Sequence, residues 1–406
     1  MTDHSTRTQD LMLALNCGSS SIKFALFEAG RQAPPREPVL GGKVQGITGP
    51  AAEFTETGAA PVALKLDAAR PYHAALEQIR QRLAERLGGR RIVAVAHRVV
   101  HGGSKYAAPV RIDAQVLADL KGYIPLAPLH QPFALEAIDV LLRERPDLPQ
   151  VACFDTAFHH SLPKVERMLP LPRLAWDRGL RRYGFHGLSY AYMAVALADR
   201  HGDAARGRTI VAHLGSGASL CAMQGLRSVA TTMGFSALDG LMMGTRCGAL
   251  DPGAVLYLME IEHLGLEQVA HLLYHESGLL GVSGLSSDSR VLLGREASDE
   301  GARDALALFV RRMVREIGAL VAVLGGLDML VFTAGVGENS AEIRRRVCAG
   351  LGFLGVALDE AANGRNASVI SAAGSAITVG VEPTNEEWIV ASEASRLLAD
   401  PHVHVA

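Results

Sequence analysis

The pattern of apolar and polar positions along the chain predicts an α/β protein. Two apolar runs flank a Gly-Ser-rich turn in LMLALNCGSSSIKFALFEAG, residues 11–30, which is typical of a β-hairpin. Apolar residues recur at helical spacing from Tyr72 to Leu87, and the strand-like run RIVAVAH follows them. The helix-like stretch PFALEAIDVLLRER then precedes the strand-like run VACFD. Because strands and helices alternate in this order, we expect sheets that are covered by helices.

The second half of the chain repeats this alternation. A wide apolar stripe predicts a helix over Ala302–Leu324, and the strand-like run MLVFT follows it and ends in AGVGENS. The apolar segment from Ile317 to Gly337 is as long as a membrane span, but Asp328 and two consecutive glycines interrupt it. We therefore interpret it as the end of a helix, a break and a buried strand.

The remaining segments give weaker signals. Residues 31–62 are rich in Pro and Gly, which predicts short strands and surface loops. Thr384 is followed three residues later by Glu387, which predicts a capping box that opens a C-terminal helix over residues 385–400. A strand followed by a turn is expected at three places, namely near the start of the chain, at LGSG and at AGVG. This recurrence would fit a chain built from two related halves, although the sequence shows no repeat at a fixed short period.

Composition limits the possible partners. A chain of 406 residues, 49% hydrophobic and 20% charged, is long enough for two domains with their own cores. The net charge of -2 gives no reason to expect nucleic acid or a membrane as partner. The five cysteines are scattered and form no C-x-x-C pair, so we expect neither a disulfide framework nor a zinc site, and a cytoplasmic location fits best. The N-terminus MTDHSTRTQD lacks the apolar core of a signal peptide and is expected to be a short disordered extension.

Several loops that follow predicted strands carry candidate chemistry, since strand ends are where α/β proteins bind ligands. In NCGSSSIK, residues Asn16, Ser19, Ser21 and Lys23 offer amide and hydroxyl groups and one cation, which suit phosphate oxygens. The alternative is a Ser-rich hairpin turn with a surface lysine. The stretch HLGSGAS, residues 213–219, is either a phosphate loop or a tight hairpin.

Arg98 and Asp155 each follow a buried-looking strand. The guanidinium of Arg98 matches a carboxylate or phosphate, and the alternative is a structural ion pair. Asp155 would be costly to bury without a partner, and its alternative role is a helix cap.

Two further candidates lie in the second half. His186 in RRYGFHG is either a catalytic group or a hydrogen-bonded structural histidine. Arg246 lies in a segment with few charges, so it requires an anion, and Asp239 or Asp251 could be its structural partner. Motifs for serine hydrolases, zinc proteases, EF-hands and P-loops are absent, and neither GSGASL nor GVGENS has the third glycine of a dinucleotide fingerprint.

Taken together, these segments resemble the acetate kinase family over almost the whole chain. The resemblance is carried by NCGSSSIKF, HRVVHGG, APLHQP, FDTAFH, RRYGFHG, MGTR, FTAGVGENS and PTNEE, in this order. It implies two domains, residues 1–156 with 385–406 and residues 157–384, each with the ribonuclease H-like βββαβαβα core of sugar kinases and actin. It further implies an active site in the cleft between them and a reversible reaction that converts ATP and acetate into acetyl phosphate and ADP.

The resemblance also assigns roles to the residues that match the family motifs. The catalytic group comprises Asp155, His186, Arg246 and His130. The acetate site comprises Arg98, Val100, Leu129, Phe185 and Ala237. The nucleotide group comprises Lys23, Ser19, Ser21, His213, Leu214, Gly215, Ser216, Gly217, Asp288, Ser289, Arg290, Gly335, Val336, Gly337, Glu338 and Asn339. Asn16 and Glu386 would hold Mg²⁺, or Mn²⁺ in its place, and a homodimer and a role in acetyl-CoA biosynthesis are further expectations.

The chain departs from the family pattern at several positions. Ser216 replaces an asparagine, which shortens one side-chain contact to a phosphate. Ala237 replaces a proline in the methyl pocket, and the space gained predicts improved use of propionate, since burying one methylene contributes about 0.8 kcal/mol. Leu188, Tyr190 and Ala249 also differ from the pattern, with no effect that the sequence alone indicates.

Three functions stay open at this point. The first is an acetate kinase that excludes water from phosphoryl transfer, and the second is a kinase for propionate or another short-chain carboxylate. The third is a non-catalytic nucleotide-dependent switch. The set of Arg98, Asp155, His186 and Arg246 disfavours the switch, because a switch needs no carboxylate site. Since a carboxylate nucleophile is already ionised at neutral pH, we expect Asp155 to orient other groups rather than to act as a base.

Overall fold

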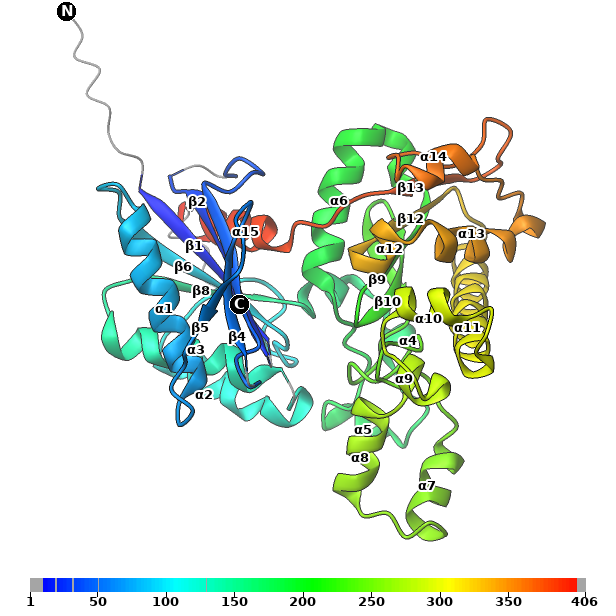
Figure 1. The fold of residues 1–406 in the computed structure, drawn as a ribbon, viewed down its shortest axis with the longest axis horizontal. Helices are drawn as coiled ribbons and strands as arrows, with labels where there is room; N and C mark the ends of the chain where they lie inside the picture. Colours follow the sequence, from blue (N-terminus) through cyan, green and yellow to red (C-terminus); the bar gives the residue numbers. More distant parts are fainter. Residues whose placement is uncertain (1–9, 19, 31–32, 50, 129, 400–406) are drawn as a thin grey trace, which may run out of the picture. The chain divides into compact units, whose positions relative to one another are not determined.

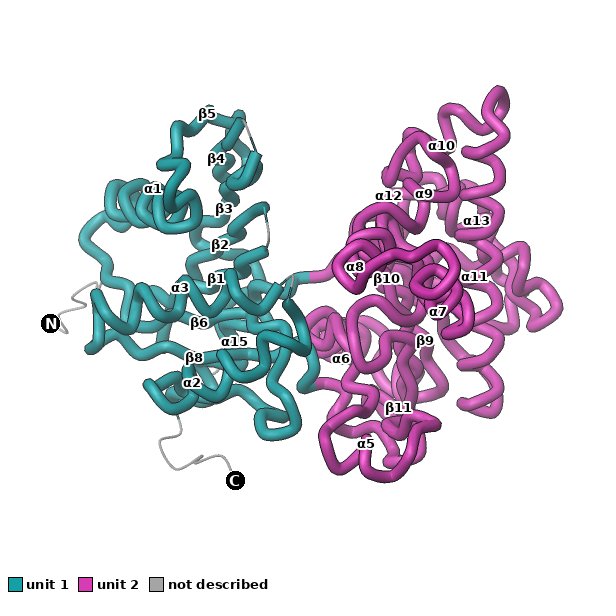
Figure 2. Tube along the Cα trace, turned by 90° about the horizontal axis from the view of Figure 1, so that it is seen from below, with its two compact units in different colours: residues 1–157, 385–406 teal, residues 158–384 magenta. Residues whose placement is uncertain are grey.

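The structure is a computed structural model that describes residues 10–399 except for residues 19, 31, 32, 50 and 129. The chain divides into two compact units, which Figure 2 shows in different colours. Unit 1 comprises residues 1–157 and 385–406, and unit 2 comprises residues 158–384. Each unit is built around its own β-sheet.

Unit 1 contains an eight-stranded sheet with the order β5-β4-β3-β2-β1-β6-β8-β7. Its strands are β1 (Leu11–Cys17), β2 (Ser21–Glu28), β3 (Leu40–Gln45), β4 (Ala52–Glu56), β5 (Val62–Leu64), β6 (Ile92–Val99), β7 (Val110–Arg111) and β8 (Gln150–Phe154). The predicted hairpin is confirmed, because β1 and β2 pair antiparallel. Strands β6 and β8 extend the sheet in parallel to β1.

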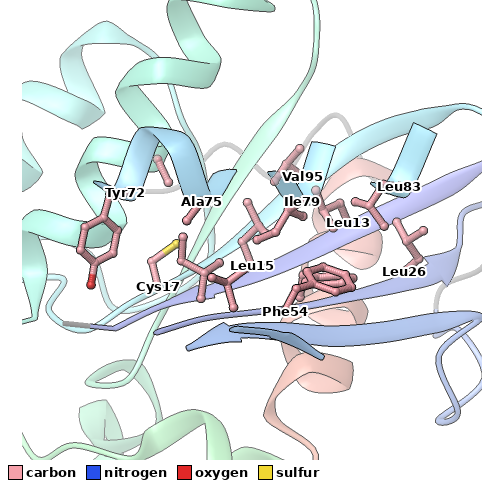
Figure 3. Close-up of a cluster of buried hydrophobic side chains, with 14 of the residues drawn as sticks. Leu13, Leu15, Cys17, Leu26, Phe54, Tyr72, Ala75, Ile79, Leu83 and Val95 are labelled. Carbon is pink, nitrogen blue, oxygen red and sulfur yellow. The ribbon is translucent and has the colours of Figure 1, made fainter. Parts of the chain in front are cut away.

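The helices of unit 1 cover both faces of this sheet. They are α1 (Pro71–Arg86), α2 (Ala114–Gly122), α3 (Gln131–Glu144) and α15 (Glu386–Ala399). Alternate side chains of β1 pack against α1 in an apolar cluster, where Leu13 and Leu15 meet Ile79 and Leu83 (Figure 3). The C-terminal helix α15 contacts β1, β2, β6 and β8. It lies on the other face of the sheet from α1 and α3 (Figure 1).

Unit 2 contains a five-stranded sheet with the order β11-β10-β9-β12-β13. Its strands are β9 (Arg208–Leu214), β10 (Ala218–Gln224), β11 (Arg227–Thr231), β12 (Met329–Thr333) and β13 (Thr378–Val381). Strands β9 to β11 pair antiparallel, and β12 and β13 continue in parallel to β9. This matches the order and directions of β3-β2-β1-β6-β8 in unit 1, so both units contain the same five-stranded plan.

The helices of unit 2 differ widely in length. They are α4 (Lys164–Arg167), α5 (Arg173–Asp177), α6 (Gly187–His201), α7 (Pro252–Glu260), α8 (Leu266–His275), α9 (Gly278–Ser283), α10 (Ser289–Arg295), α11 (Glu300–Leu324), α12 (Ala334–Asn339), α13 (Ala341–Ala349) and α14 (Glu360–Gly364). Helix α11 ends at a left-handed Gly325, and the buried strand β12 follows, as the sequence predicts. Among the helices described here, none is long and apolar enough to cross a bilayer.

The cap of α15 differs from its prediction. The backbone N–H of Trp388 donates to Oδ1 of Asn385 over 3.0 Å, so Asn385 rather than Thr384 is the capping residue. The hydroxyl of Thr384 instead lies 3.0 Å from Oγ of Ser189. All five cysteines are free thiols, and four of them are buried.

Candidate active site

In unit 1, the alternation of side chains along the strands brings four candidate residues together. Leu15 and Cys17 of β1 face the cluster under α1, so Asn16 points to the opposite face, where α15 lies. Arg98 of β6 alternates in the same way with the buried Val99. Its Nη1 donates to Oδ1 of Asn16 over 2.9 Å.

Arg98 also forms an ion pair with Asp155, which follows the end of β8. Nε of Arg98 lies 3.0 Å and Nη2 lies 2.5 Å from Oδ2 of Asp155. The carboxylate of Asp155 is buried, with a side-chain exposure of 2%. The ion pair that the sequence left open for Arg98 therefore exists, and its partner is a second candidate residue. A buried bidentate pair of this kind fixes both side chains.

Glu386, the first residue of α15, completes this group. Its Oε2 lies 3.9 Å from Nε of Arg98. Burial raises the pKa of Glu386 to about 7, Arg98 lowers it, and the neighbouring carboxylates of Asp155 and Glu387 raise it further. Lys23 also lowers this pKa, so cations and carboxylates both act on Glu386.

The other candidates of unit 1 lie on β2, just after β6 and just before α3. Lys23 is an exposed residue of β2 and lies directly opposite Lys43 of β3. Ser21 opens β2, Val100 is buried just after β6, and His130 immediately precedes α3. The predictions for Ser19 and Leu129 lie outside the described residues.

In unit 2, two candidate histidines lie against each other. The rings of His186 and His213 stack with their centroids 4.1 Å apart and their planes inclined by 18°. His213 lies in β9 directly opposite Ser219 of β10. Each histidine has a serine at Nδ1, since His186 lies 2.8 Å from Oγ of Ser219 and His213 lies 2.9 Å from Oγ of Ser189. Each ring is therefore held by a serine hydroxyl at its own Nδ1.

The loop before α6 sets the position of His186. His186 has a left-handed backbone with φ of 58°, which is unusual for a residue other than glycine. The preceding carbonyl of Phe185 lies 2.9 Å from Nε2 of the buried His159. Gly184 passes so close to His159 that a Cβ there would lie 2.5 Å from the imidazole ring. A glycine is required at this position, and the loop is consequently fixed.

Arg246 approaches the same loop as His186. A Cβ placed on Gly217 would lie 3.3 Å from Nε2 of His186 and 3.7 Å from Nη1 of Arg246, so both side chains point to this glycine. Nη1 of Arg246 also donates to the carbonyl of Ala237 over 2.9 Å. The loop 214–217 is thus lined by an imidazole and a guanidinium from two separate segments, a suitable set of donors for an anion.

The carboxylates proposed as alternative partners of Arg246 have other contacts. Asp239 lies 3.7 Å from Nη1 of Arg182 and accepts the backbone N–H of Gly240. Asp251 accepts the backbone N–H of Gly253 and caps α7.

The other predicted nucleotide segments of unit 2 lie at helix starts. Residues 335–339 lie in α12, directly after β12, and Oε1 of Glu338 accepts the backbone N–H groups of Ala334 and Thr384. Asp288 caps α10 and forms a 2.6 Å ion pair with the exposed Arg290. Ser289 is buried, and its hydroxyl has no hydrogen-bond partner among the described residues.

Sequence reasoning missed the residues that hold the two histidines. Ser219 is the last residue of the stretch HLGSGAS, and Ser189 lies in the first turn of α6. The sequence alone indicates no effect of Tyr190, yet its hydroxyl lies 2.5 Å from Oγ of Ser219. The register of the β9–β10 hairpin places Ser219 opposite His213, but Ser219 forms its hydrogen bond with His186, which stacks on His213.

Comparison with known proteins gives this geometry a family. The model of the Acetokinase family matches residues 11–392. The chain belongs to the acetokinase family. It is 48% identical over 394 residues to a protein named acetate kinase from Rhodopseudomonas palustris, covering 96% of this chain and 98% of the relative. It is 46% identical over 399 residues to a protein named acetate kinase from Methylocella silvestris, covering 95% of this chain and 98% of the relative.

Solved structures of the family have the same fold. The crystal structure of Porphyromonas gingivalis acetate kinase superposes with a TM-score of 0.85 at 36% identity, covering 96% of this chain and 100% of that chain. A propionate kinase from Francisella tularensis superposes with a TM-score of 0.87 at 34% identity, covering 95% and 98%. The predicted α/β class with the two-domain actin-like ATPase fold is thereby confirmed. The predicted assignment of this chain to the phosphotransferases that have a carboxyl group as acceptor is confirmed as well.

Proposed function

We propose that this protein is an acetate kinase, which transfers the γ-phosphoryl group of ATP reversibly to acetate and forms acetyl phosphate and ADP. The observation that carries the proposal is the paired arrangement of Arg98 with Asp155 in a chain of the acetokinase family. Such a site holds an arginine rigidly while leaving it able to bind a second anion.

The donors of Arg98 are sufficient for both tasks. A guanidinium has five N–H groups, and the contacts with Asp155 and Asn16 require three of them. One N–H on each terminal nitrogen is left for the carboxylate of acetate. We propose that Asp155 and Asn16 hold the plane of the guanidinium, so that acetate binds in one orientation.

The reaction brings two anions together, so neutralising their charge is the main task of the protein. A carboxylate oxygen of acetate attacks the γ-phosphorus, and the bond from that phosphorus to the bridging oxygen of ADP breaks. No proton needs to be removed from the nucleophile, since acetate is ionised at neutral pH. We propose that Arg246 and His186 donate to the equatorial oxygens of the transferred group, and that the loop 213–217 and the segments 288–290 and 335–339 bind the nucleotide with Lys23.

The donor set at Asn16 and Glu386 fits a divalent cation. Amide and carboxylate oxygens are the ligands that Mg²⁺ and Mn²⁺ prefer. Burial, and to a smaller extent the carboxylates of Asp155 and Glu387, raise the pKa of Glu386 to about 7. Mg²⁺ held there would neutralise charge on the phosphate oxygens. We propose Mg²⁺ as the metal, a cytoplasmic location and a homodimer, all on the basis of the family resemblance.

A second candidate substrate is propionate. It is favoured by Ala237, which stands in place of the proline expected from the family pattern and whose backbone carbonyl accepts from Arg246, and by the likeness to a propionate kinase. We propose that acetate remains the main substrate and that propionate is used with lower efficiency.

A direct assay tests this function. The purified chain is incubated with Mg²⁺, ATP and acetate, propionate or butyrate, and the acyl phosphate is trapped as its hydroxamate. We expect the highest kcat/KM with acetate, then propionate, then butyrate. Higher kcat/KM with propionate would make the chain a propionate kinase, and the absence of any acyl phosphate would exclude both candidates.

A further inference from the structure

Three side chains of unit 2 form a continuous series of hydrogen bonds, which we call the relay. They are Tyr190, Ser219 and His186. The hydroxyl of Tyr190 lies 2.5 Å from Oγ of Ser219, and this same Oγ lies 2.8 Å from Nδ1 of His186. Tyr190 and Ser219 are fully buried, so bulk water does not compete for these contacts. The direction of each hydrogen bond can therefore be derived from the number of donors.

The phenol of Tyr190 must be the donor in its bond to Ser219. Burial raises its pKa well above the ordinary value, so the hydroxyl keeps its proton. Among the described residues, Oγ of Ser219 is the only partner of this hydroxyl. If Ser219 donated instead, the O–H of Tyr190 would be a buried donor without an acceptor, which is costly.

Ser219 in turn must donate to His186. Its single proton is not used toward Tyr190, and its other side-chain partner is Nδ1 of the imidazole. Nδ1 therefore accepts a hydrogen bond and carries no proton. We infer that Tyr190 and Ser219 are positioning residues that keep His186 neutral, with its single ring proton on Nε2.

The surroundings of His186 agree with a neutral ring. The centroid of its imidazole lies 4.1 Å from that of His213, and Nη1 of Arg246 points to the same Gly217 as Nε2 does. A second positive charge would be repelled by Arg246, and protonation of Nδ1 would turn the hydroxyl of Ser219 away from its acceptor. His186 thus contributes a hydrogen-bond donor aimed at the loop, while Arg246 contributes the charge.

Packing fixes the phenol of Tyr190, which is the first group of the relay. The ring of Tyr190 lies edge-on to His159, with centroids 5.5 Å apart, and edge-on to His213, at 6.4 Å. His159 also holds the carbonyl of Phe185, the residue before His186. Tyr190, which departs from the family pattern, is therefore well placed to control the proton on the candidate catalytic histidine.

The inference that this proton serves phosphoryl transfer rests on the proposed function, but the position of the proton can be measured without activity. Long-range ¹H–¹⁵N correlation spectra of the full chain with ¹⁵N-labelled histidine distinguish a protonated from an unprotonated ring nitrogen. The signals of His186 are assigned from their loss in His186→Gln. We expect an unprotonated Nδ1 and a protonated Nε2 at pH 7.5, and a protonated Nδ1 would overturn the inference.

Two variants sharpen the test. In Tyr190→Phe the oxygen of Ser219 is released to accept from Nδ1–H, so the shifts of the two nitrogens should move toward each other as the tautomers mix. We expect kcat for acetyl phosphate formation to fall roughly fivefold, with the KM for acetate almost unchanged, as for the loss of one hydrogen bond. Ser219→Ala should mix the tautomers further.

Tyr183→Phe is the matched control. It removes a phenol hydroxyl of the same unit that donates to the carbonyl of Gly179 over 2.8 Å, away from the relay. Its His186 shifts should equal those of the unchanged chain. Identical shifts in Tyr190→Phe and the unchanged chain would overturn the relay. An inactive chain with the expected tautomer would overturn the proposed function and support the relay, whereas an active chain with Nδ1 protonated would do the reverse.

Discussion

The two units hold their candidate catalytic residues by different physical means. In unit 1, the group around Arg98 is held by charge, through a buried ion pair with Asp155 and the nearby carboxylate of Glu386. In unit 2, His186 and His213 are held by the hydroxyls of serines at Nδ1. Removing one member of a buried ion pair leaves an uncompensated charge, while removing a hydroxyl leaves a smaller defect. Equivalent truncations should therefore have larger effects in unit 1.

The largest effect is expected for Arg98→Ala. This variant removes the proposed ligand of acetate and leaves the buried Asp155 without its partner, which costs about 3 to 5 kcal/mol for a buried pair. We predict that kcat/KM for acetate falls roughly 1000-fold or more, measured with the hydroxamate assay. Arg111→Ala, an exposed arginine on β7 of the same unit, is the control and should stay active. A loss below tenfold in Arg98→Ala would refute the role of the ion pair.

The next largest effect is expected for Asp155→Asn, which tests whether Asp155 orients Arg98 or acts as a general base. Asp155→Asn keeps the shape of the side chain but weakens its hold on Arg98, so kcat should fall roughly 100-fold, about 2.7 kcal/mol. Because acetate needs no base, the shape of the pH profile of kcat should stay unchanged. Asp147→Asn changes an exposed aspartate of the same unit and should be neutral. Near wild-type kcat in Asp155→Asn would exclude both roles, and loss of a basic limb would indicate a general base.

A smaller effect is expected from Ala237, the residue of unit 2 that we propose lines the acyl pocket. Ala237→Pro restores the residue of the family pattern and keeps the backbone carbonyl that accepts from Arg246. The ratio of kcat/KM for propionate to that for acetate should fall about fourfold, which corresponds to about 0.8 kcal/mol for one buried methylene. Measuring both acids with the same preparation provides the internal control. An unchanged or higher ratio would show that Ala237 does not line the pocket.

The smallest effect concerns stability and the surplus of carboxylates on α15. Burial raises the pKa of Glu393 from 4.5 to about 7, so the folded state binds a proton that the unfolded state has released. Its contribution to stability is present below pH 4.5 and is lost as the pH rises to about 7. Glu393→Gln should therefore raise the free energy of unfolding at pH 8 and leave it unchanged near pH 4. Equal gains at both pH values, in urea titrations, would contradict this assignment.

Much of the fold and half of the candidate site follow from local sequence patterns. The β1–β2 hairpin, α11 with its glycine end and the strand β12 are short-range features that apolar periodicity and turn residues specify. Arg98 and Asp155 could be predicted because Arg98 lies near the carboxyl end of β6 and Asp155 directly follows β8, and the ends of parallel strands lie at one edge of the sheet.

The relay could not be predicted in the same way. It depends on the rotation of α6, which places Tyr190 against Ser219, and periodicity alone does not distinguish this orientation from a purely apolar contact. The cap of α15 was missed for a similar reason. Thr384 and Asn385 are both good caps, and the choice is made by the contact of Thr384 with Ser189, far away in the sequence.

The central claim is that a carboxylate oxygen of the substrate forms the new bond to the transferred phosphorus. Acetate labelled with ¹⁸O at both oxygens, converted by this chain and observed by ³¹P NMR, tests it most directly. The account predicts acetyl phosphate whose phosphorus signal carries the isotope shift of one ¹⁸O, because the bridging oxygen comes from acetate. Acetyl phosphate with an unshifted signal, or none at all, would contradict the account.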